Sequence, residues 1–425
     1  MYSITTGDIL HVYGPFGAGT DYTVRLTVRV RDDVDGSVLQ EALTKTQSRY
    51  PYFSVRMLRG EDEFYYEDNP SPVVLHHTDE RISLNSEGSN YHVWSVCYNG
   101  DRIHLDFYHG IADGTGMYMV LSTLLYYYCS KRYGLSDHSG IRTLEDPIRP
   151  EETTDPYDLL PKLDLSALKI PEMPPVFTLI EDGGLTPSGS TLVWDIEVPE
   201  GDFVRFSSAN DASPGTMVSI LLARTIDAVF PDRIKALMNG YVINGRPMLG
   251  ANQSHHNCVT TVMFPYTDRV KALPFDRQCT VHRGTTFIQS DELHVRKSMT
   301  VSANRFRMIG QTPGIEAKEQ AFGQIIKGAT RRFTHIVSYV GKWKYESLSP
   351  YILEFRTHVP GANGLLAEIS AVNGKILISI HQKFTEDIVI KEFLHQLDEN
   401  GIMHSIVWSG VNDNAHFQEP AKDAE

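Results

Sequence analysis

Long apolar runs are missing from this 425-residue sequence, and their absence argues against a membrane-spanning helix. No uninterrupted apolar stretch approaches the roughly 20 residues that a helix needs to cross a bilayer. The start of the chain, MYSITTGDILHVYG, also lacks the basic and apolar regions of a secretory signal. We therefore expect a cytoplasmic protein that does not bind membranes.

Cysteine is scarce, and the few cysteines are far apart. Cys97, Cys129, Cys258 and Cys279 form no CxxC pair, so the sequence offers no disulfide framework. Reduced and mostly buried thiols fit this pattern, as does a reducing compartment.

Basic residues are outnumbered, with 39 lysines and arginines against 53 acidic residues and a formal net charge of −14. Such a surface repels phosphate backbones and anionic lipids, which disfavours nucleic acid as a partner. Hydrophobic residues make up 41% of the chain and charged residues 22%, a globular composition. At roughly 100–200 residues per domain, the length predicts two or three domains.

The first part of the chain reads as mixed α/β. Residues 22–31, YTVRLTVRVR, alternate apolar and polar side chains, a pattern typical of a half-buried strand. A helix ending before Pro51 follows, with Ser37 and Gln40 at capping-box spacing. Further strands are predicted at 53–59, 63–67, 91–99 and 102–109, and a buried helix at 117–129. Asn99-Gly100 predicts a hairpin turn.

Seven of the 22 prolines lie between Pro147 and Pro175, which favours a domain boundary there. A second α/β stretch follows. Its predicted strands are 190–199, 241–247, 258–266, 333–341, 351–357, 365–372 and 375–382, and its predicted helices are 214–230, a long region over 284–329, and 386–401. A faint echo relates the halves: Asn99-Gly100 leads to His109 and a helix, and Asn373-Gly374 leads to His381 and a helix.

The sharpest local feature is FYHGIADGTG, residues 107–116. A strand ends in aromatic residues and delivers His109 into a glycine-rich turn, with Asp113 four residues later and a large helix behind it. An imidazole with a pKa near neutrality can act as a general base toward a hydroxyl or amine. On the residues alone, a histidine that merely caps a turn is the favoured interpretation, as for most of the 17 histidines, and the general base is the alternative.

The segment YHGIADG resembles the HHxxxDG motif of the coenzyme A-dependent acyltransferase superfamily, which includes chloramphenicol acetyltransferases, alcohol acetyltransferases and condensation domains. Residues 33–57 are similar to the family's early helix and RHPxLR-like segment. Residues 244–247, NGRP, resemble its GRxxP region, 257–265 the strand that follows, and 338–341, SYVG, its SNxG segment. The resemblance thus spans nearly the whole chain in the right order.

The resemblance implies two chloramphenicol-acetyltransferase-like α/β sandwich subdomains, related by a pseudo-twofold axis, with the active site in the cleft between them. Residues 1–165 would form the N-terminal subdomain, 166–415 the C-terminal subdomain and 416–425 a disordered tail. The protein would move an acyl group from a coenzyme A or pantetheine thioester to the hydroxyl or amine of a small acceptor. No metal and no bound cofactor would be needed.

The resemblance also assigns roles to residues. His109 would be the general base, with Asp113 and Gly114 completing the motif and Tyr108 in place of its first histidine. Asp113 would pair with an arginine and hold the loop rather than touch the substrate. Ser338 would support the reaction from the second half.

Ser54 stands where the family's second arginine would be, so the partner of Asp113 must come from elsewhere. Arg246, in a Gly-Arg-Pro turn at the end of a predicted strand, is the favoured partner, Arg56 is the rival, and an arginine bonded only to water is a third possibility.

Alternatives to the coenzyme A enzyme stay open at this point. A free-standing condensation enzyme would take its acyl group from an acyl carrier protein, and a catalytically silent binding protein would keep only the fold. His255 and His256 carry metal-capable atoms, but adjacent residues of a strand point to opposite faces and do not easily share one ion.

Overall fold

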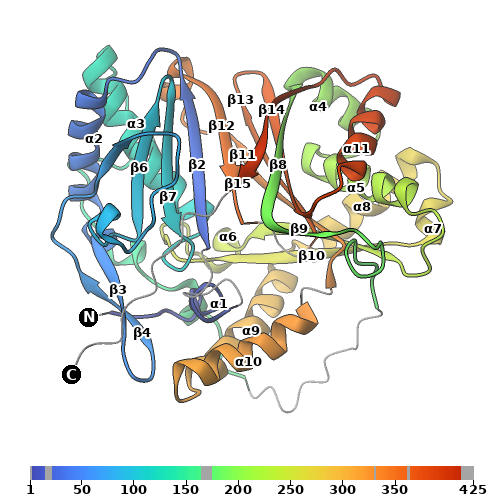
Figure 1. Cartoon of the computed structure of the whole chain (residues 1–425), viewed down its shortest axis with the longest axis horizontal. Helices are drawn as coiled ribbons and strands as arrows, with labels where there is room; N and C mark the ends of the chain where they lie inside the picture. The colour runs from blue at the N-terminus through green and yellow to red at the C-terminus, as the bar shows by residue number, and fades with distance from the viewer. Residues whose placement is uncertain (1, 15–21, 164–174, 330–331, 361–363, 413–425) are drawn as a thin grey trace.

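The computed structural model describes residues 2–14, 22–163, 175–329, 332–360 and 364–412 (Figure 1). The domain boundary predicted at 165/166 and the predicted tail at 416–425 lie outside these residues.

A five-stranded sheet forms the centre of the first half. Its order is β12-β2-β7-β6-β5. The strands are β2 (Thr23–Val30), β5 (Leu75–His77), β6 (Trp94–Asn99), β7 (Arg102–Tyr108) and β12 (Ile352–His358). Helices α2 (Gly36–Arg49) and α3 (Gly114–Tyr133) cover its outer face. The small sheet β1-β4-β3 lies beside it, formed by β1 (Tyr2–Ser3), β3 (Val55–Arg59) and β4 (Phe64–Asp68), with the short helix α1 (Ile9–Tyr13) near the domain interface.

A seven-stranded sheet forms the centre of the second half, in the order β10-β9-β11-β13-β14-β8-β15. Its strands are β8 (Pro187–Pro199), β9 (Leu237–Asn244), β10 (Val259–Tyr266), β11 (His335–Lys342), β13 (Leu365–Val372), β14 (Lys375–Phe384) and β15 (Ser405–Asn412). The helices of this half are α4 (Glu200–Ala209), α5 (Pro214–Val229), α6 (Arg246–Leu249), α7 (Asp268–Lys271), α8 (Phe275–Gln289), α9 (Glu292–Gly310), α10 (Ile315–Ala329) and α11 (Ile388–Glu399).

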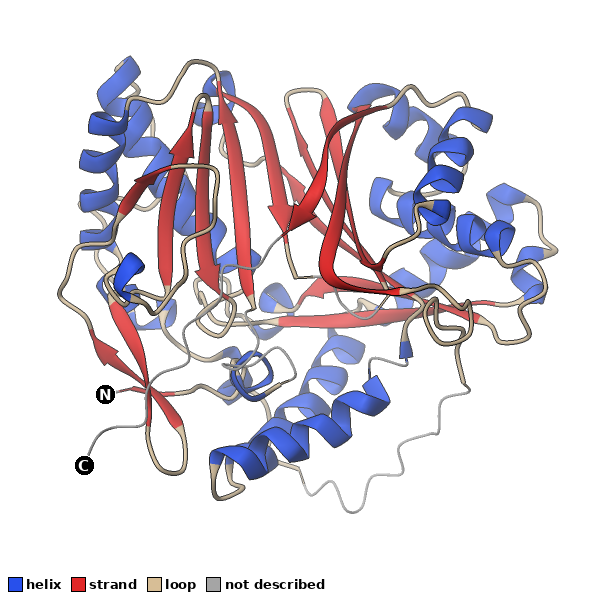
Figure 2. Cartoon of the chain, viewed as in Figure 1, coloured by secondary structure: helices blue, strands red, loops and turns tan. Residues whose placement is uncertain are grey.

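Figure 2 shows the two large sheets side by side in the middle of the molecule, with helices on both outer sides. Helices α4, α5, α8 and α11 lie beyond the seven-stranded sheet, and α9 and α10 lie together below both sheets (Figure 1). This is the two-sandwich α/β architecture that the motif resemblance implied. None of the described helices is long and apolar enough to cross a membrane.

Two matching hairpins appear in the two halves. β6 and β7 pair antiparallel across Gly100, whose φ of +53° suits glycine, and β7 then delivers the chain to α3. β13 and β14 pair antiparallel across Asn373-Gly374, and β14 leads to α11. The faint sequence echo between the halves is thus a repeated strand-strand-helix unit.

The start of α2 differs from the sequence prediction. Ser37 and Gln40 do not form a capping box; instead the helix begins at Gly36, and the Asp35 carboxylate accepts hydrogen bonds from the backbone N–H groups of Ser37 and Val38. Aspartate is as good an N-cap as serine, and Asp35 stands two residues before the predicted cap Ser37.

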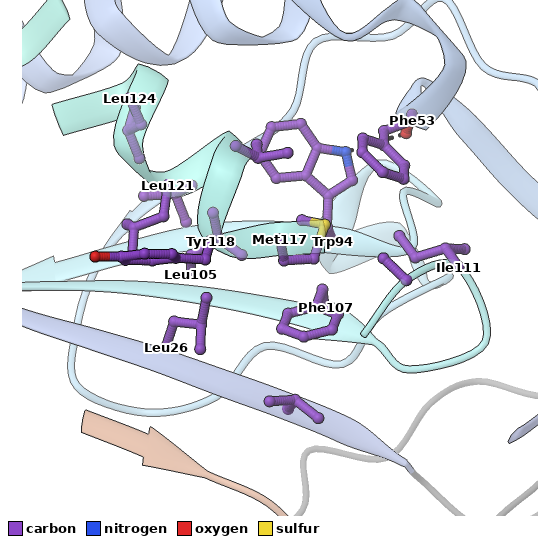
Figure 3. Packing of buried hydrophobic residues seen from close by; sticks show 14 of the residues in the cluster. Leu26, Phe53, Trp94, Leu105, Phe107, Ile111, Met117, Tyr118, Leu121 and Leu124 are labelled. Carbon is purple, nitrogen blue, oxygen red and sulfur yellow. Dashed lines mark hydrogen bonds between the residues drawn. The ribbon is translucent and has the colours of Figure 1, made fainter. Parts of the chain in front are cut away.

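The core of the first half lies between α3 and the five-stranded sheet. Met117, Leu121 and Leu124 of α3 pack toward Leu105 and Phe107 of β7 (Figure 3). Trp94 fills the space beside them, and its indole N–H donates to the carbonyl of Phe53 at 3.1 Å. Because this core holds both the end of β7 and the start of α3, it fixes the loop between them from behind. All four cysteines are buried in the protein and form no disulfide.

β12 belongs to the C-terminal half of the chain but joins the five-stranded sheet of the N-terminal half, which the sequence did not predict. It pairs antiparallel with β2, with Phe355 opposite Val28. Two of its polar side chains reach back to β8: Arg356 donates to Asp195 at 2.8 Å, and His358 lies 3.0 Å from the other oxygen of the same carboxylate. Asp195 is fully buried, so β12 links the two sheets through a buried ion pair.

We expect Asp195→Ala to destabilise the protein by about 3 kcal/mol, the lower end of the range for a broken buried pair, because the buried Arg356 keeps Glu354 as its second acidic partner while His358 loses the Asp195 carboxylate. Asp202→Ala is the matched control, since Asp202 pairs with Arg205 on the surface and such pairs contribute about 0–1 kcal/mol. Chemical denaturation measures both. Equal losses in the two variants would show that β12 is not held by the buried pair.

Candidate active site

A cavity of about 510 Å³ lies between the two halves. Its walls come from α1, β2 and the start of α3 on one side, and from β9, β10, β11 and β13 on the other. The lining residues include His11, Tyr22, Val24, His109, Asp113, Gly114, Thr115, Tyr118, Asn244, Val259, Thr261, His335, Ile336, Ser338, Tyr339, Lys342, Lys344, Val359, Leu366 and Glu368. Most of the wall is apolar, and the motif loop opens into it.

His109 follows the last residue of β7 and lines this cavity. Its backbone N–H donates to the carbonyl of Tyr22 at 2.9 Å, and its carbonyl accepts from the Asn257 side-chain amide at 2.9 Å. Its imidazole stacks on His11, with ring centroids 3.9 Å apart, and on Tyr22 at 4.8 Å. His109 is therefore packed between rings, whereas a loop histidine would have few contacts.

Burial lowers the pKa of His109 below its usual value, although its own backbone and the carboxylates of Asp113 and Asp8 oppose the shift. The pKa of His11 is also well below normal, through burial and the neighbouring His109 ring. Both imidazoles are thus neutral at pH 7. Nδ1 of His109 is buried, so a ligand in the cavity would approach the ring at Nε2.

Asp113 and Arg246 form a bidentate ion pair across the interface between the halves. The two guanidinium nitrogens donate to the two carboxylate oxygens at 2.8 and 2.7 Å, and Arg246 is 1% exposed. Arg246 also donates to the carbonyls of Ser254 and His256, at 2.9 and 2.7 Å. The pair expected from the sequence is present, and Arg246 is held on several sides.

Asp113 has a second task as the N-cap of α3. Its Oδ1 accepts from the backbone N–H of Gly116 at 2.9 Å, and its Oδ2 accepts from that of Cys258 at 3.1 Å. Residue 116 has to be glycine, because the backbone of His255 lies so close that a Cβ there would be 2.2 Å from its carbonyl oxygen. The carboxylate therefore fixes the loop, the helix start and the opposite half at once.

Arg56, the rival partner, lies elsewhere. It pairs with Glu67 on the neighbouring strand, and its side chain is 44% exposed. Ser54, at the position of the family's second arginine, accepts a hydrogen bond from Gln47. The alternative that Arg56 replaces that arginine is wrong, as is the alternative of an arginine bonded only to water.

Of the other predicted site residues, Gly114 and Ser338 line the cavity and Tyr108 lies in the core. Gly114 lines the cavity, and a Cβ at that position would meet no atom within 4 Å. Tyr108 is fully buried and does not line the cavity; its hydroxyl donates to the carbonyl of His11 at 3.0 Å. Ser338 lies on β11 in the cavity wall, next to Glu368 of β13.

His255 and His256 lie in a loop before β10 and not, as the sequence suggested, in a strand. His255 Nδ1 lies 2.9 Å from the carbonyl of Gly116, and His256 Nδ1 lies 2.8 Å from the Asp8 carboxylate. The two rings thus have separate protein partners. Within the described part of the chain, no three histidine, cysteine or acidic side chains gather as a metal site would require.

Sequence reasoning missed three side chains of the cavity: His11, Tyr22 and Glu368. His11 and Tyr22 lie far from the motif in sequence and reach His109 only through the packing of α1 and β2. Glu368 lies in a run, LLAEISAV, that reads as an ordinary buried strand. The sign of Glu368 in the sequence was an acidic residue inside an otherwise apolar strand.

Comparison with solved structures finds proteins of similar fold. The chain has the fold of TRI101 of Fusarium sporotrichioides, solved with coenzyme A and T-2, with a TM-score of 0.62 and 11% identity over 95% of this chain and 98% of that one. It is also similar to the trichothecene 15-O-acetyltransferase TRI3 of the same organism, with a TM-score of 0.58 and 11% identity over 94% of each chain. Polyketide synthase associated protein 5 of Mycobacterium tuberculosis gives a TM-score of 0.59 at 11% identity, over 93% of this chain and 97% of that one.

No protein-family model matches the chain, and the search of curated proteins found no match. The similarity therefore resides in the fold, at sequence identities of 11%. The fold that the motif resemblance implied is confirmed by these structures.

We expect Asp113→Ala and Arg246→Ala each to destabilise the protein by about 3–5 kcal/mol, because each leaves a buried charge unpaired. The double variant should lose little more than either single variant, since the two side chains act on each other. Unfolding free energies from denaturant titration measure the cycle. Arg56→Ala is the surface control, and strictly additive losses at 113 and 246 would contradict the coupling.

Glu368 predicts a pH dependence of stability. Burial raises its pKa to about 8, although the Ser338 hydroxyl opposes the shift. Between the unfolded pKa of about 4.3 and the folded value, the folded state holds a proton that the unfolded state has lost, so stability falls as pH rises. Glu368→Gln stays neutral, and its melting temperature should fall less than that of the wild type between pH 5 and pH 8. An unchanged pH slope would mean that Glu368 is ionised in the native protein.

Proposed function

We propose that the protein is an acyltransferase that moves an acyl group from a coenzyme A thioester to the hydroxyl or amine of a small acceptor. One observation carries this proposal: the neutral imidazole of His109 opens into a cavity shared by both halves, on a loop fixed by the Asp113–Arg246 pair. The fold supports it, because the similar TRI101 structures were solved with coenzyme A.

His109 is the general base in this proposal. Its Nε2 accepts the proton of the acceptor hydroxyl or amine as the acceptor oxygen or nitrogen bonds to the thioester carbonyl carbon. The carbon–sulfur bond then breaks, and the same nitrogen returns the proton to the departing thiolate. Proton gain and loss balance on one side chain, so the enzyme ends the cycle as it began.

Asp113 acts on the reaction as a positioning residue through the loop, since both of its oxygens are occupied by Arg246 and by backbone donors. Gly114 leaves space in the cavity wall next to His109, which suits an acyl thioester at that point. Ser338 contributes a hydroxyl to the same wall. Tyr108 supports His109 indirectly, through its bond to the backbone of His11.

Coenzyme A is the donor we favour over an acyl carrier protein, because the similar structures contain coenzyme A itself. A cytoplasmic location and the division into subdomains 1–165 and 166–415 stay predictions.

The proposal is tested by incubating the protein with a panel of acyl-coenzyme A donors and small alcohols and amines. Free thiol released only when donor and acceptor are both present, with the acylated acceptor seen by mass spectrometry, is the expected result. Thiol release with acyl carrier protein donors alone would indicate the condensation enzyme. No release with any donor, from protein that binds coenzyme A, would indicate a silent binding protein.

His109→Ala should lower the rate of transfer by about 10²–10⁴-fold, the contribution of a positioned general base. Because the ring stacks on His11 and Tyr22, the variant's melting temperature is measured alongside its rate. His11→Ala removes the same kind of ring contact and is the matched control for packing. A folded His109→Ala protein with more than a third of the wild-type rate would reject His109 as the base.

A further inference from the structure

Glu368 is a buried carboxyl group in the wall of the cavity. It lies in the middle of β13, where Leu365, Ala367 and Ile369 pack into the core beneath α5 and α11. Successive side chains of a strand point to opposite faces, so Glu368 points to the other side, which is the cavity side. Its side chain is 8% exposed.

The other charged side chains of the cavity wall have partners. Asp113 pairs with Arg246, and Lys342 pairs with Glu200 at 2.7 Å. The Lys344 ammonium lies over the rings of Tyr118 and Tyr345, 5.4 and 5.3 Å from their centroids.

Glu368 differs from these groups. Its partner is the hydroxyl of Ser338, which lies opposite it on the neighbouring parallel strand β11. Within the residues that the structure describes, no lysine, arginine or histidine forms an ion pair with it.

A carboxyl group without a cation is costly in such a place, because burial in low dielectric disfavours its charged form. That cost appears in its pKa, which burial raises to about 8. An apolar residue would pack in β13 as well as its neighbours do. The position therefore supplies something that packing does not need, a buried carboxyl group to which a ligand in the cavity can bind.

Glu368 and His109 belong to the same cavity, and Tyr22 connects them. Tyr22 stacks on His109 at 4.8 Å, and the charge of Glu368 contributes to raising the pKa of Tyr22, after burial as the main cause. The remaining titratable groups of the wall are His11, His335, Asp113, Lys342, Lys344, Tyr118 and Tyr339. A ligand in this cavity can therefore meet a base and a carboxyl group at once.

We propose that Glu368 binds a basic nitrogen of the acceptor, so that the acceptor is an amine-bearing molecule such as an amino alcohol or a diamine. Its ammonium group pairs with Glu368, and its second nucleophilic group reaches His109. This assignment rests on the proposed function. When the ammonium binds, the neutral carboxyl group releases its proton to solvent and becomes the carboxylate of the ion pair.

The low dielectric of the apolar wall strengthens this ion pair once it forms, and the Ser338 hydroxyl donates to the carboxylate. The competing possibility is that Glu368 stays protonated and donates a hydrogen bond to an oxygen of the acceptor. Glutamine mimics that neutral donor but cannot form the ion pair, so Glu368→Gln separates the two.

The test is calorimetric binding of aminohexanol and of hexanediol, two chains of equal length, at pH 7 in buffers of different ionisation enthalpy. Wild-type protein should bind aminohexanol about tenfold more tightly than hexanediol, as a charge-assisted hydrogen bond provides, and release a proton on binding. Glu368→Gln should lose both the preference and the proton release. Glu61→Gln, which removes an exposed carboxylate, should keep both.

Three results would overturn the assignment: no binding of aminohexanol to the wild type, equal binding of the two probes, or a preference that Glu368→Gln retains. Glu368→Asp, which keeps the charge, guards against a folding defect and should release a proton on binding with weaker affinity. Because binding is measured without a donor, thiol release that fails while aminohexanol binds would reject the transferase and leave the cation site. Transfer that proceeds without an amine preference would reject only the role of Glu368.

Discussion

The ion pair between Asp113 and Arg246 is the contact on which the arrangement of the site depends. Burying two charges costs several kcal/mol for each ion, and an isolated pair recovers that cost only with good geometry and further hydrogen bonds. Here the pair is bidentate, and backbone groups from α3, from the loop before β10 and from Cys258 satisfy the remaining donors and acceptors. One contact therefore holds the motif loop, the first turn of α3 and the C-terminal half in a single geometry.

That geometry gives His109 its properties. Its backbone is fixed on one side by Tyr22 and on the other by Asn257, and its ring lies against His11. Burial keeps the imidazole neutral, which is the form that accepts a proton. Burial in the wall of the same mostly apolar cavity raises the pKa of Glu368 to about 8. The two unusual pKa values thus have one cause, which is the exclusion of water between the two sheets.

Sequence patterns within a single helix, strand or turn predicted the structure of that element. The strand β2, the apolar helix α3 and the hairpin turn at Asn99-Gly100 were predicted because their signals lie within one element. β2 was expected to be half-buried, but its polar face is also covered, with Thr23, Arg25 and Thr27 buried. Arg246 was among the candidates because it stands in a Gly-Arg-Pro turn at the end of a strand. The role of Asp35 as the α2 cap was missed because Ser37 offered an equally good pattern two residues later.

What the sequence could not predict depends on contacts between distant segments. The passage of β12 into the N-terminal sheet, the placing of His11 on His109 and the exposure of Glu368 to the cavity follow from tertiary packing. Arg246 was favoured over Arg56 from its place in a turn at a strand end, but its further bonds to the carbonyls of Ser254 and His256 were not predicted. β15 was also missed, since its apolar residues are largely exposed at a sheet edge and give no alternating pattern.

A crystal structure of the protein with coenzyme A tests most directly whether the cavity that contains His109 is the active site. The pantetheine arm should enter the cavity between the halves, with its sulfur within about 3.5 Å of His109 Nε2 or of an acceptor atom that is hydrogen-bonded to that nitrogen. His109 would not be the base if coenzyme A bound elsewhere, with its sulfur far from this residue. One such place is the surface cleft lined by Arg49, His138 and Arg142.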